Sequence, residues 1–164
     1  MDIRFRDAQP ADYQTVLDLN DASVHYLSPL DGERLARLAS ESCQFRVAVR
    51  GGKIIGFLMA FADEADYDSM NYRWFATRYR RFVYIDRVVV REDCRGLGLA
   101  RRFYQELEAW AMQHTMTRLS CEVDVDPPNA ASLAFHDKAG FREVGRQVAG
   151  DDSKVVSLRT KLMG

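Results

Sequence analysis

The sequence predicts an α/β (α+β) protein with a single mixed, mostly antiparallel sheet of about seven strands, a central parallel pair and helices on both faces. Strand and helix patterns alternate in the second half of the chain, whereas hairpins lie toward both ends. An apolar strand at residues 82–90 precedes a helical pattern at 99–112, and another strand pattern follows at 117–123. This unit is expected to be a right-handed crossover between parallel neighbours.

The first half of the chain predicts three strands and two helices. Residues 2–6 alternate apolar and polar side chains, which is typical of a half-buried strand. Pro10 stands near the start of a helix, and Asp31 is placed to cap a second one. Alternation then predicts strands at 43–49 and 54–61, joined by a two-glycine turn.

In the second half, periodicity is lost from 62 to 81, which predicts a long loop or a short helical insertion. After the crossover, Asn129 is well placed as the N-cap of a helix that ends at Gly140. Strand patterns at 141–148 and 155–162 predict a final antiparallel hairpin.

Length and composition bound the class of protein. A chain of 164 residues suits one compact domain, so residues 1–164 are expected to form a single domain. A net charge of −1 gives no global field for nucleic acid or for an anionic membrane. The three cysteines lack Cys-x-x-Cys spacing and the three histidines are scattered, which predicts reduced thiols, a cytoplasmic protein and no metal site. The first residues show no signal-peptide pattern, and no apolar run is long enough to span a membrane.

The turn between the central strand and its helix has the chemistry of an anion site. Glycines let a phosphate approach the backbone, the helix N-terminus presents N–H groups, and Arg95, Arg101 and Arg102 add charge. A P-loop requires a Gly-Lys-Ser/Thr ending that the chain lacks. Gly96 and Gly98 match the first two glycines of the dinucleotide-binding fingerprint, but Arg101 stands in place of the third.

Two motifs together resemble the GNAT acetyltransferase superfamily. The run from Arg95 to Ala100, Arg-Gly-Leu-Gly-Leu-Ala, is similar to that superfamily's acetyl-coenzyme A pyrophosphate loop. The second motif is a strand containing Glu122-Val, then Asn129, an aromatic pair ending at His136, and Gly-Phe. Their order and context support each other, and the resemblance implies the GNAT fold.

The resemblance also implies which residues bind acetyl-coenzyme A. Backbone groups of Val88 and Val90 are expected to pair with the pantetheine amides as an added strand would, and the 95–100 backbone to hold the pyrophosphate. The expected coenzyme-binding residues are Val88, Val89, Val90, Arg95, Gly96, Leu97, Gly98, Leu99, Ala100, Arg101 and Asn129.

The catalytic residues predicted are His136, Glu122 and Asp86. The family usually has tyrosine at position 136, where it protonates the leaving thiolate, and a histidine could also donate a proton there. The alternative for His136 is a hydrogen-bonded helix residue without a chemical role. Glu122 matches a strand glutamate that serves as base in some family members, with Asp86 and Tyr84 as rival positions. The alternative for each carboxylate is a solvated charge.

The amine acceptor is expected to meet the segment before the central strand. Asp66 and Asp68 form an acidic rim that could attract a cationic amine, and Tyr72 and Trp74 could wall its pocket. The alternative is a loop whose aromatic side chains pack as satellite core. Ser23, His25 and Tyr26 are further positions that could contribute.

The predicted function is therefore an acetyl-CoA-dependent N-acetyltransferase, with acetyl-CoA as co-substrate and a primary amine attacking the thioester directly in a ternary complex. The backbone N–H of Val90 would polarise the thioester carbonyl. The expected partner is a small-molecule or peptide amine, not nucleic acid or membrane, and a homodimer is possible. Two alternatives stay open: an inactive acyl-CoA-binding protein of the same fold, and a nucleic-acid module using the arginines and aromatics of 72–82.

Overall fold

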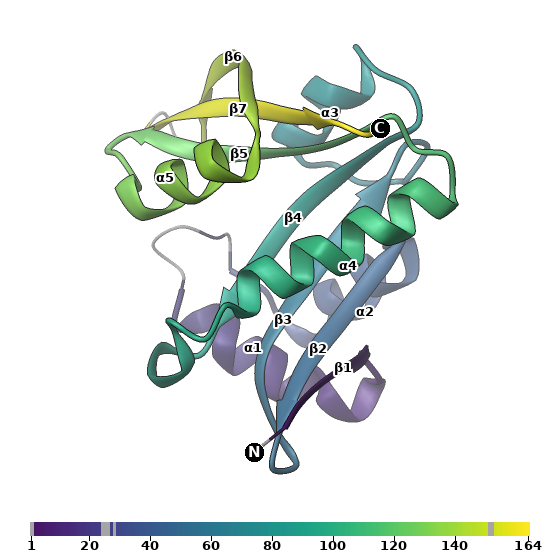
Figure 1. Ribbon diagram of the computed structural model, residues 1–164, viewed down its shortest axis with the longest axis vertical. Coiled ribbons are helices and arrows are strands. Elements are labelled where there is room, and N and C mark those ends of the chain that lie inside the picture. Colours follow the sequence, from purple (N-terminus) through teal and green to yellow (C-terminus); the bar gives the residue numbers. More distant parts are fainter. Residues whose placement is uncertain (1, 24–26, 28, 151–152) are drawn as a thin grey trace. The chain divides into compact units, whose positions relative to one another are not determined.

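The computed structural model describes residues 2–23, 27, 29–150 and 153–164, and it contains one seven-stranded sheet in the order β1-β2-β3-β4-β5-β7-β6 (Figure 1). The strands are β1 Ile3–Asp7, β2 Gln44–Arg50, β3 Lys53–Ala62, β4 Phe82–Val90, β5 Arg118–Asp126, β6 Arg142–Ala149 and β7 Lys154–Leu162. The helices are α1 Tyr13–Asp21, α2 Gly32–Glu41, α3 Met70–Ala76, α4 Leu99–Gln113 and α5 Ala130–Ala139, with short 3₁₀ turns η1 Pro10–Asp12 and η2 Glu92–Cys94.

The pairing of the strands confirms the predicted mixed sheet. β1 pairs with β2, β2 with β3, β5 with β7, and β6 with β7, all antiparallel. The parallel ladder joins Phe82–Tyr84 of β4 to Arg118–Ser120 of β5. The sheet is therefore mostly antiparallel, and the parallel pair follows from the long connection through α4.

The chain divides into two compact units. The first unit contains residues 1–61 and 85–109, and the second contains residues 62–84 and 110–164. β4 contributes its first three residues to the second unit and the rest to the first. Each unit is described by itself below, and the single domain over residues 1–164 stays a prediction.

In the first unit, helices cover both faces of the strands (Figure 1). Phe103 of α4 contacts Phe5 of β1 with ring centroids 4.6 Å apart, on one face. Tyr13 of α1 stacks on Phe45 of β2 at 5.9 Å, on the other face. This division follows from the alternation of side chains along each strand. The largest fully buried side chains of this unit are Phe57, Phe61, Phe103, Leu35, Leu38, Ile55, Leu58, Met59 and Leu107.

In the second unit, α3 and α5 lie on opposite faces of the β5–β7–β6 ladder (Figure 1). Trp74 of α3 packs on Gly145 of β6, where a Cβ would lie only 2.5 Å from the indole. Asp137 of α5 forms an ion pair with Arg159 of β7. The helix α3 is the short insertion that loss of periodicity indicated for this part of the chain.

The predicted helix ends are confirmed. Asp31 accepts a hydrogen bond from the N–H of Arg34 at 2.7 Å, and Asn129 accepts one from Ser132 at 3.3 Å. Gly140 ends α5 with a φ of 97°, a left-handed conformation that glycine adopts without strain.

One strand is longer than its apolar pattern predicts. β5 continues past Val123 to Asp126, because antiparallel pairing with β7 extends to Asp126 opposite Val155. A register shift between Asp124 and Asp126 accommodates this end of the strand. Backbone pairing therefore overrides the loss of apolar side chains.

In the part of the chain that the structure describes, no helix is long and apolar enough to cross a membrane.

Gly56 provides a test of packing in the first unit. An added Cβ would lie 2.8 Å from the carbonyl oxygen of Val89, a backbone atom that cannot move aside. We expect Gly56→Ala to lower the free energy of unfolding by about 1–3 kcal/mol, measured by urea denaturation. The matched control is Gly32→Ala, since nothing lies within 4 Å of a Cβ there. Equal stability of the two variants would contradict the prediction.

Candidate active site

The turn between β4 and α4, in the first unit, is shaped by two glycines. Gly96 and Gly98 have φ angles of 82° and 76°, in the left-handed region that other residues enter only with strain. A Cβ at either position would meet nothing within 4 Å. Backbone conformation rather than crowding therefore requires glycine here, and the space beside both residues is open.

Side chains and backbone fix the start of this turn. The N–H of Arg91 donates to the carbonyl of Ile55 in β3 at 2.8 Å, and its guanidinium donates to Asp93 at 2.6 Å. Arg50 of β2 donates to the Cys94 sulfur at 3.2 Å. These contacts hold the turn against two neighbouring strands.

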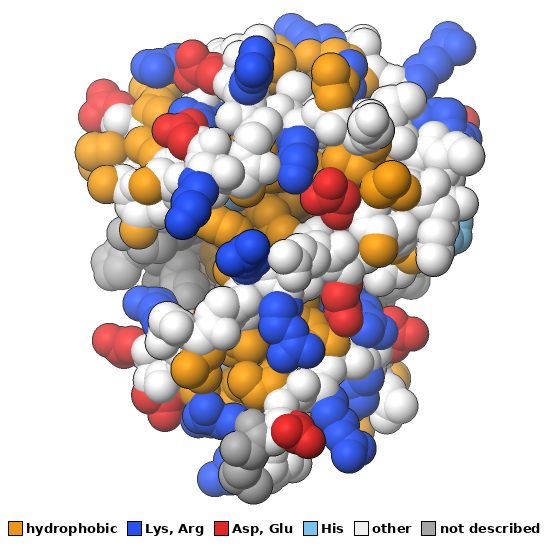
Figure 2. Space-filling model, in the orientation of Figure 1, with side chains coloured by type: hydrophobic (Ala, Val, Ile, Leu, Met, Phe, Trp, Pro, Cys, Tyr) orange, Lys and Arg blue, Asp and Glu red, His pale blue; other side chains and the backbone are white. Residues whose placement is uncertain are grey.

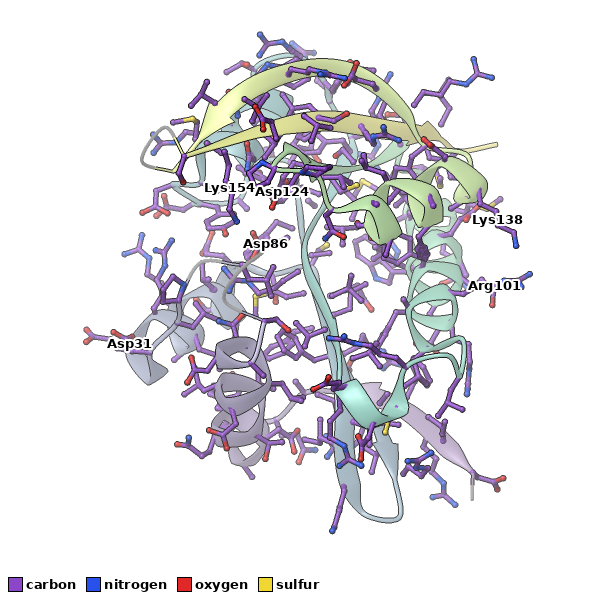
Figure 3. All side chains as sticks on the ribbon, turned by 90° about the vertical axis from the view of Figure 1, so that its left-hand side faces the viewer. Asp31, Asp86, Arg101, Asp124, Lys138 and Lys154 are labelled. Atoms are coloured by element: carbon purple, nitrogen blue, oxygen red, sulfur yellow. The ribbon has the colours of Figure 1, made fainter. Side chains whose placement is uncertain are left out.

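The turn ends at the N-terminus of α4, where charge and dipole coincide. The N–H of Arg102 donates to the Gly98 carbonyl at 3.0 Å. The N–H groups of the helix residues before Arg102 have no acceptor within the helix. Arg95 and Arg101 are exposed, and Arg101 extends outward from α4 (Figure 3). Two glycines, free helix-start amides and exposed arginines are a donor set suited to a pyrophosphate.

Asp86 belongs to a buried polar network in the first unit. Its side chain is 6% exposed and accepts a hydrogen bond from the Nε of Arg87 at 2.7 Å. Arg87 also donates to the side-chain oxygen of Asn20 at 2.8 Å. A buried guanidinium requires such partners, so Asp86 has a structural function whether or not it acts in chemistry. Its role as a base stays a prediction.

Asn129 and His136 both lie on the second unit's α5. The side-chain oxygen of Asn129 caps the helix, whereas its amide nitrogen is not the capping atom. Its predicted contact with the coenzyme stays a prediction.

The imidazole of His136 is held in one tautomer. His136 is 5% exposed, and its Nδ1 lies 2.8 Å from the backbone carbonyl oxygen of Ser132, one turn earlier. A carbonyl oxygen only accepts, so Nδ1 carries the proton and Nε2 of the neutral ring carries a lone pair. The ring packs edge-to-face on Phe141 at 5.1 Å.

Two effects keep this imidazole neutral. Burial lowers the pKa of His136, and the positive charge of Arg159 lowers that pKa further. The hydrogen bond to Ser132 and the charge of Asp137 act in the opposite direction but are smaller than burial. At neutral pH the site at position 136 therefore presents an acceptor rather than an N–H donor at Nε2.

Cys121 is on the same side of the sheet as α5, because it lies opposite Arg159 in the β5–β7 ladder. Burial raises the pKa of the Cys121 thiol well above its ordinary value. Burial also raises the pKa of Cys43 to about 12. Neither thiol is therefore a thiolate nucleophile near neutral pH.

Glu122 makes a short contact that sequence patterns did not indicate. The hydroxyl of Tyr84 donates to its Oε2 at 2.6 Å. From the sequence, Tyr84 was predicted only as an alternative base to Glu122, whereas in the structure the two side chains are hydrogen-bonded to each other. The register that pairs Tyr84 with Ser120 explains the contact, because Glu122 is two residues further along the same face of β5.

Within the second unit, Glu122 and His136 lie on opposite faces of the sheet. Glu122 shares its face with Tyr84 and α3, while α5 covers the face of Cys121 and Arg159. Asp124, on the Glu122 face by alternation, forms an ion pair with Lys154 at 3.3 Å, and the two labelled side chains are neighbours in Figure 3.

The predicted acceptor residues divide into exposed and buried. Asp66 and Asp68 are exposed. Tyr72 is 2% exposed, and its hydroxyl donates to the Ala62 carbonyl at 2.6 Å and accepts from a backbone N–H at 3.1 Å. Trp74 is half-buried. Tyr72 thus packs as core in the described structure, and direct contact of these residues with an acceptor stays a prediction. His25 and Tyr26 lie outside the described residues.

The arginines and aromatics after α3 contact one another. Arg78 stacks over Trp74 at 3.9 Å, and Arg118 over Tyr79 at 3.8 Å. These stacks occupy aromatic faces that a nucleic-acid base would need. On the face drawn in Figure 2, Lys and Arg side chains lie between acidic and apolar ones rather than in one continuous field.

No group of three or more His, Cys, Asp or Glu residues suited to a metal ion occurs among the described residues.

Comparison with protein-family models finds one that covers most of the chain. The model described as the acetyltransferase (GNAT) family matches residues 8–141. A comparison with curated proteins finds no match.

Solved structures share the fold over nearly the full length of the chain. Ard1 from Thermoplasma volcanium has a TM-score of 0.81 at 18% identity, covering 100% of this chain and 99% of that one. The ribosomal-protein-S18-alanine N-acetyltransferase from Escherichia coli has a TM-score of 0.75 at 14% identity, covering 99% and 95%. yncA from Salmonella typhimurium, solved with its cofactor acetyl-CoA, has a TM-score of 0.74 at 19% identity, covering 100% and 95%. At these identities the likeness shows the fold alone.

The burial of His136 predicts a pH dependence of stability. Its folded pKa lies below the ordinary 6.5, so the unfolded chain binds the proton more tightly. We expect the free energy of unfolding to fall as pH decreases through 6.5 toward the folded pKa. Urea denaturation across this range should show a weaker fall for His136→Gln.

The control for this measurement is His114→Gln, since His114 is exposed. That variant should keep the wild-type pH dependence. A His136→Gln variant with an unchanged slope would show that His136 titrates alike in the folded and unfolded chains.

Proposed function

The chain belongs to the acetyltransferase (GNAT) family, and on this premise we propose that it is an acetyl-CoA-dependent N-acetyltransferase acting on a primary amine. The observation that carries the proposal is the glycine turn at the start of α4, with its left-handed Gly96 and Gly98 and the open space beside them. Family members use acetyl-CoA, and one structural neighbour was solved with it.

Acetyl-CoA enters as co-substrate. The N–H groups from Arg95 to Ala100 bind its pyrophosphate, with Arg95 and Arg101 adding charge. Backbone groups of Val88 and Val90 pair with the pantetheine amides, Val89 lines the same strand, and the N–H of Val90 polarises the thioester carbonyl. Leu99 is 2% exposed and anchors the turn, whereas Leu97 is 48% exposed and free to contact the coenzyme.

Direct attack of the amine on the thioester fits the protonation of Cys121 and Cys43. An acyl-enzyme route needs a thiolate, and burial raises the pKa of both Cys121 and Cys43. Amine and acetyl-CoA therefore bind together, nitrogen attacks the carbonyl carbon, and the carbon–sulfur bond breaks.

Two protons leave the attacking nitrogen, which arrives as an ammonium ion. The first must be lost before attack, and Glu122 is the proposed acceptor. Because Glu122 lies on the opposite face of the ladder from His136, it takes this proton before the amine reaches the thioester. For a lysine-type amine of pKa about 10.4 this loss costs roughly 4.6 kcal/mol at pH 7, and for an α-amine near 7.8 only about 1 kcal/mol. An enzyme for α-amines thus depends less on its base.

The second proton passes from nitrogen to sulfur, and His136 is the proposed relay. Its Nε2 lone pair takes the proton from the tetrahedral intermediate and then donates it to the departing thiolate. The hydrogen bond from Nδ1 to the Ser132 carbonyl sets this resting state, because it leaves Nε2 as the acceptor. His136 thus ends as proton donor, as the family tyrosine does, but starts neutral.

The acceptor is a small-molecule or peptide amine. Among the structural neighbours, one is an N-acetyltransferase for a ribosomal-protein alanine, and another is described as a phosphinothricin N-acetyltransferase. The exposed Asp66 and Asp68 supply negative charge for a cationic acceptor. We also propose a cytoplasmic location and a single domain over residues 1–164, with a homodimer as a possible assembly.

One observation favours a second candidate, an acyl-CoA-binding protein without transferase activity. A neutral His136 has no proton at Nε2, so it cannot by itself replace the tyrosine that donates to the thiolate. This candidate predicts coenzyme binding without acyl transfer.

The glycine turn provides the test of coenzyme binding. We expect acetyl-CoA to raise the Tm of the wild-type chain, and Gly98→Ala to lose most of this shift because alanine resists a φ of 76°. The matched control is Gly52→Ala, whose φ of 75° carries the same strain in the β2–β3 turn. The control should lower the Tm of the free chain but keep the shift with acetyl-CoA.

Activity is tested by release of coenzyme A thiol in a screen of α-amines, lysine-type amines and peptide N-termini. Amine-dependent release supports the transferase. A thermal shift without release from any amine class identifies the acyl-CoA-binding candidate, and no shift at all refutes both.

The relay predicts the sign of a pH effect on kcat. Because His136 must start neutral, kcat should rise with pH through the pKa of His136, which burial places below 6.5. This limb should disappear in His136→Tyr and persist in Glu122→Gln. If kcat instead falls over the same range, His136 acts as an imidazolium acid.

A further inference from the structure

We propose that Tyr84 is the positioning residue for the acceptor-side base, fixing the carboxylate of Glu122 through the hydrogen bond from its hydroxyl. The inference rests on the proposed transferase function and deepens it at Glu122. The bond is 2.6 Å long, within the range of a hydroxyl that donates to an ionised carboxylate. A tyrosine hydroxyl stays protonated at neutral pH, so the donor is present throughout the working range.

The ring of Tyr84 is itself fixed. Tyr84 is 1% exposed, and its ring contacts Tyr72 at 5.7 Å, Phe75 at 5.9 Å and Tyr67 at 6.4 Å. Aromatic neighbours on several sides leave little room for another rotamer. The hydroxyl is therefore a rigid anchor point rather than a mobile surface group.

The sheet register sets the distance between the two side chains. Tyr84 is paired with Ser120 in the parallel ladder, and the Ser120 hydroxyl donates to the Val83 carbonyl at 2.9 Å. Glu122 follows two residues later and points to the same face. The backbone of Glu122 is thus fixed by the pairing of β5 with β4, and the hydrogen bond from Tyr84 restricts its side chain.

Glu122 is half-buried, so the bond has a chemical consequence beyond packing. One carboxylate oxygen accepts from Tyr84, which fixes the orientation of the whole group. A hydrogen bond to the ionised form also favours ionisation, which keeps Glu122 ready to accept the first proton of the acceptor.

Other charged or titratable groups lie near this face, and their effects on a pH profile must be distinguished from that of Glu122. Asp124 lies two residues further along β5 and is paired with Lys154 of β7 at 3.3 Å. Tyr72 of α3 and Tyr67 of the preceding loop bring two further hydroxyls to this face, next to the ring of Tyr84. Arg118 lies at the start of β5 and stacks on Tyr79.

The test compares Tyr84→Phe with Tyr79→Phe in the thiol-release assay. Both variants lose one hydroxyl and keep a ring in the same aromatic cluster, since Tyr79 stacks on Phe75 at 6.4 Å. We expect Tyr84→Phe to lower kcat/KM at least about tenfold, because it loses a hydrogen bond to a charged group. The Glu122 carboxylate is read in a His136→Tyr background, where the His136 limb is absent. There the remaining acidic limb should move to higher pH when Tyr84→Phe is added, because the carboxylate loses stabilisation of its ionised form. Tyr79→Phe should keep the wild-type rate and profile.

A double-mutant cycle separates positioning from stability. In a Glu122→Gln background, Tyr84→Phe should change the rate less than about twofold, since the bond it removes no longer orients a base. The Tm shift with acetyl-CoA should be unchanged in Tyr84→Phe. Multiplicative losses in the cycle, or an unshifted acidic limb when Tyr84→Phe is added to His136→Tyr, would overturn the role of Tyr84.

Failure of the proposed function is recognised separately. If the wild-type chain releases no thiol with any amine, the transferase proposal fails and the catalytic role of Tyr84 fails with it. If the wild type is active and Tyr84→Phe behaves like Tyr79→Phe, only the positioning role is overturned.

Discussion

The strand β4 is the constraint on which the candidate residues of each unit depend. Its first residues, Phe82–Tyr84, form the parallel ladder with β5, and its remaining residues lie in the first unit and lead into the glycine turn. Because side chains alternate along a strand, the register that pairs Tyr84 with Ser120 also brings Tyr84 to Glu122. The strand ends at Val90, just before the glycine turn.

Burial decides the protonation states that the proposed chemistry needs. His136 is kept neutral because burial disfavours its charged form, and the Ser132 carbonyl selects which nitrogen carries the proton. Cys121, across from Arg159 in the same part of the sheet, is kept as a thiol by the same physical effect. A neutral imidazole and an inert thiol thus arise from one low-dielectric environment around α5.

The two carboxylates predicted as bases differ in what holds them. Asp86 accepts from a buried guanidinium, which also binds Asn20, so its charge is required to compensate Arg87. Glu122 accepts from a neutral hydroxyl and is half-buried. A carboxylate that balances a buried cation is held in place by that structural function, whereas Glu122 is held by a hydroxyl. This contrast favours Glu122 as the base.

The sequence by itself determined the features that depend on short spacings. The strand at 82–90, the caps at Asp31 and Asn129, the helix end at Gly140 and the glycine turn all follow from local periodicity and backbone preference. Only the tertiary structure decided the tautomer of His136, the partner of Glu122 and the burial of Tyr72. Glu122 and Tyr84 are 38 residues apart, and their contact depends on strand register, which no local pattern specifies. Tyr72 was a possible pocket wall in the sequence, and only packing against other aromatic side chains shows that its ring lies in the core.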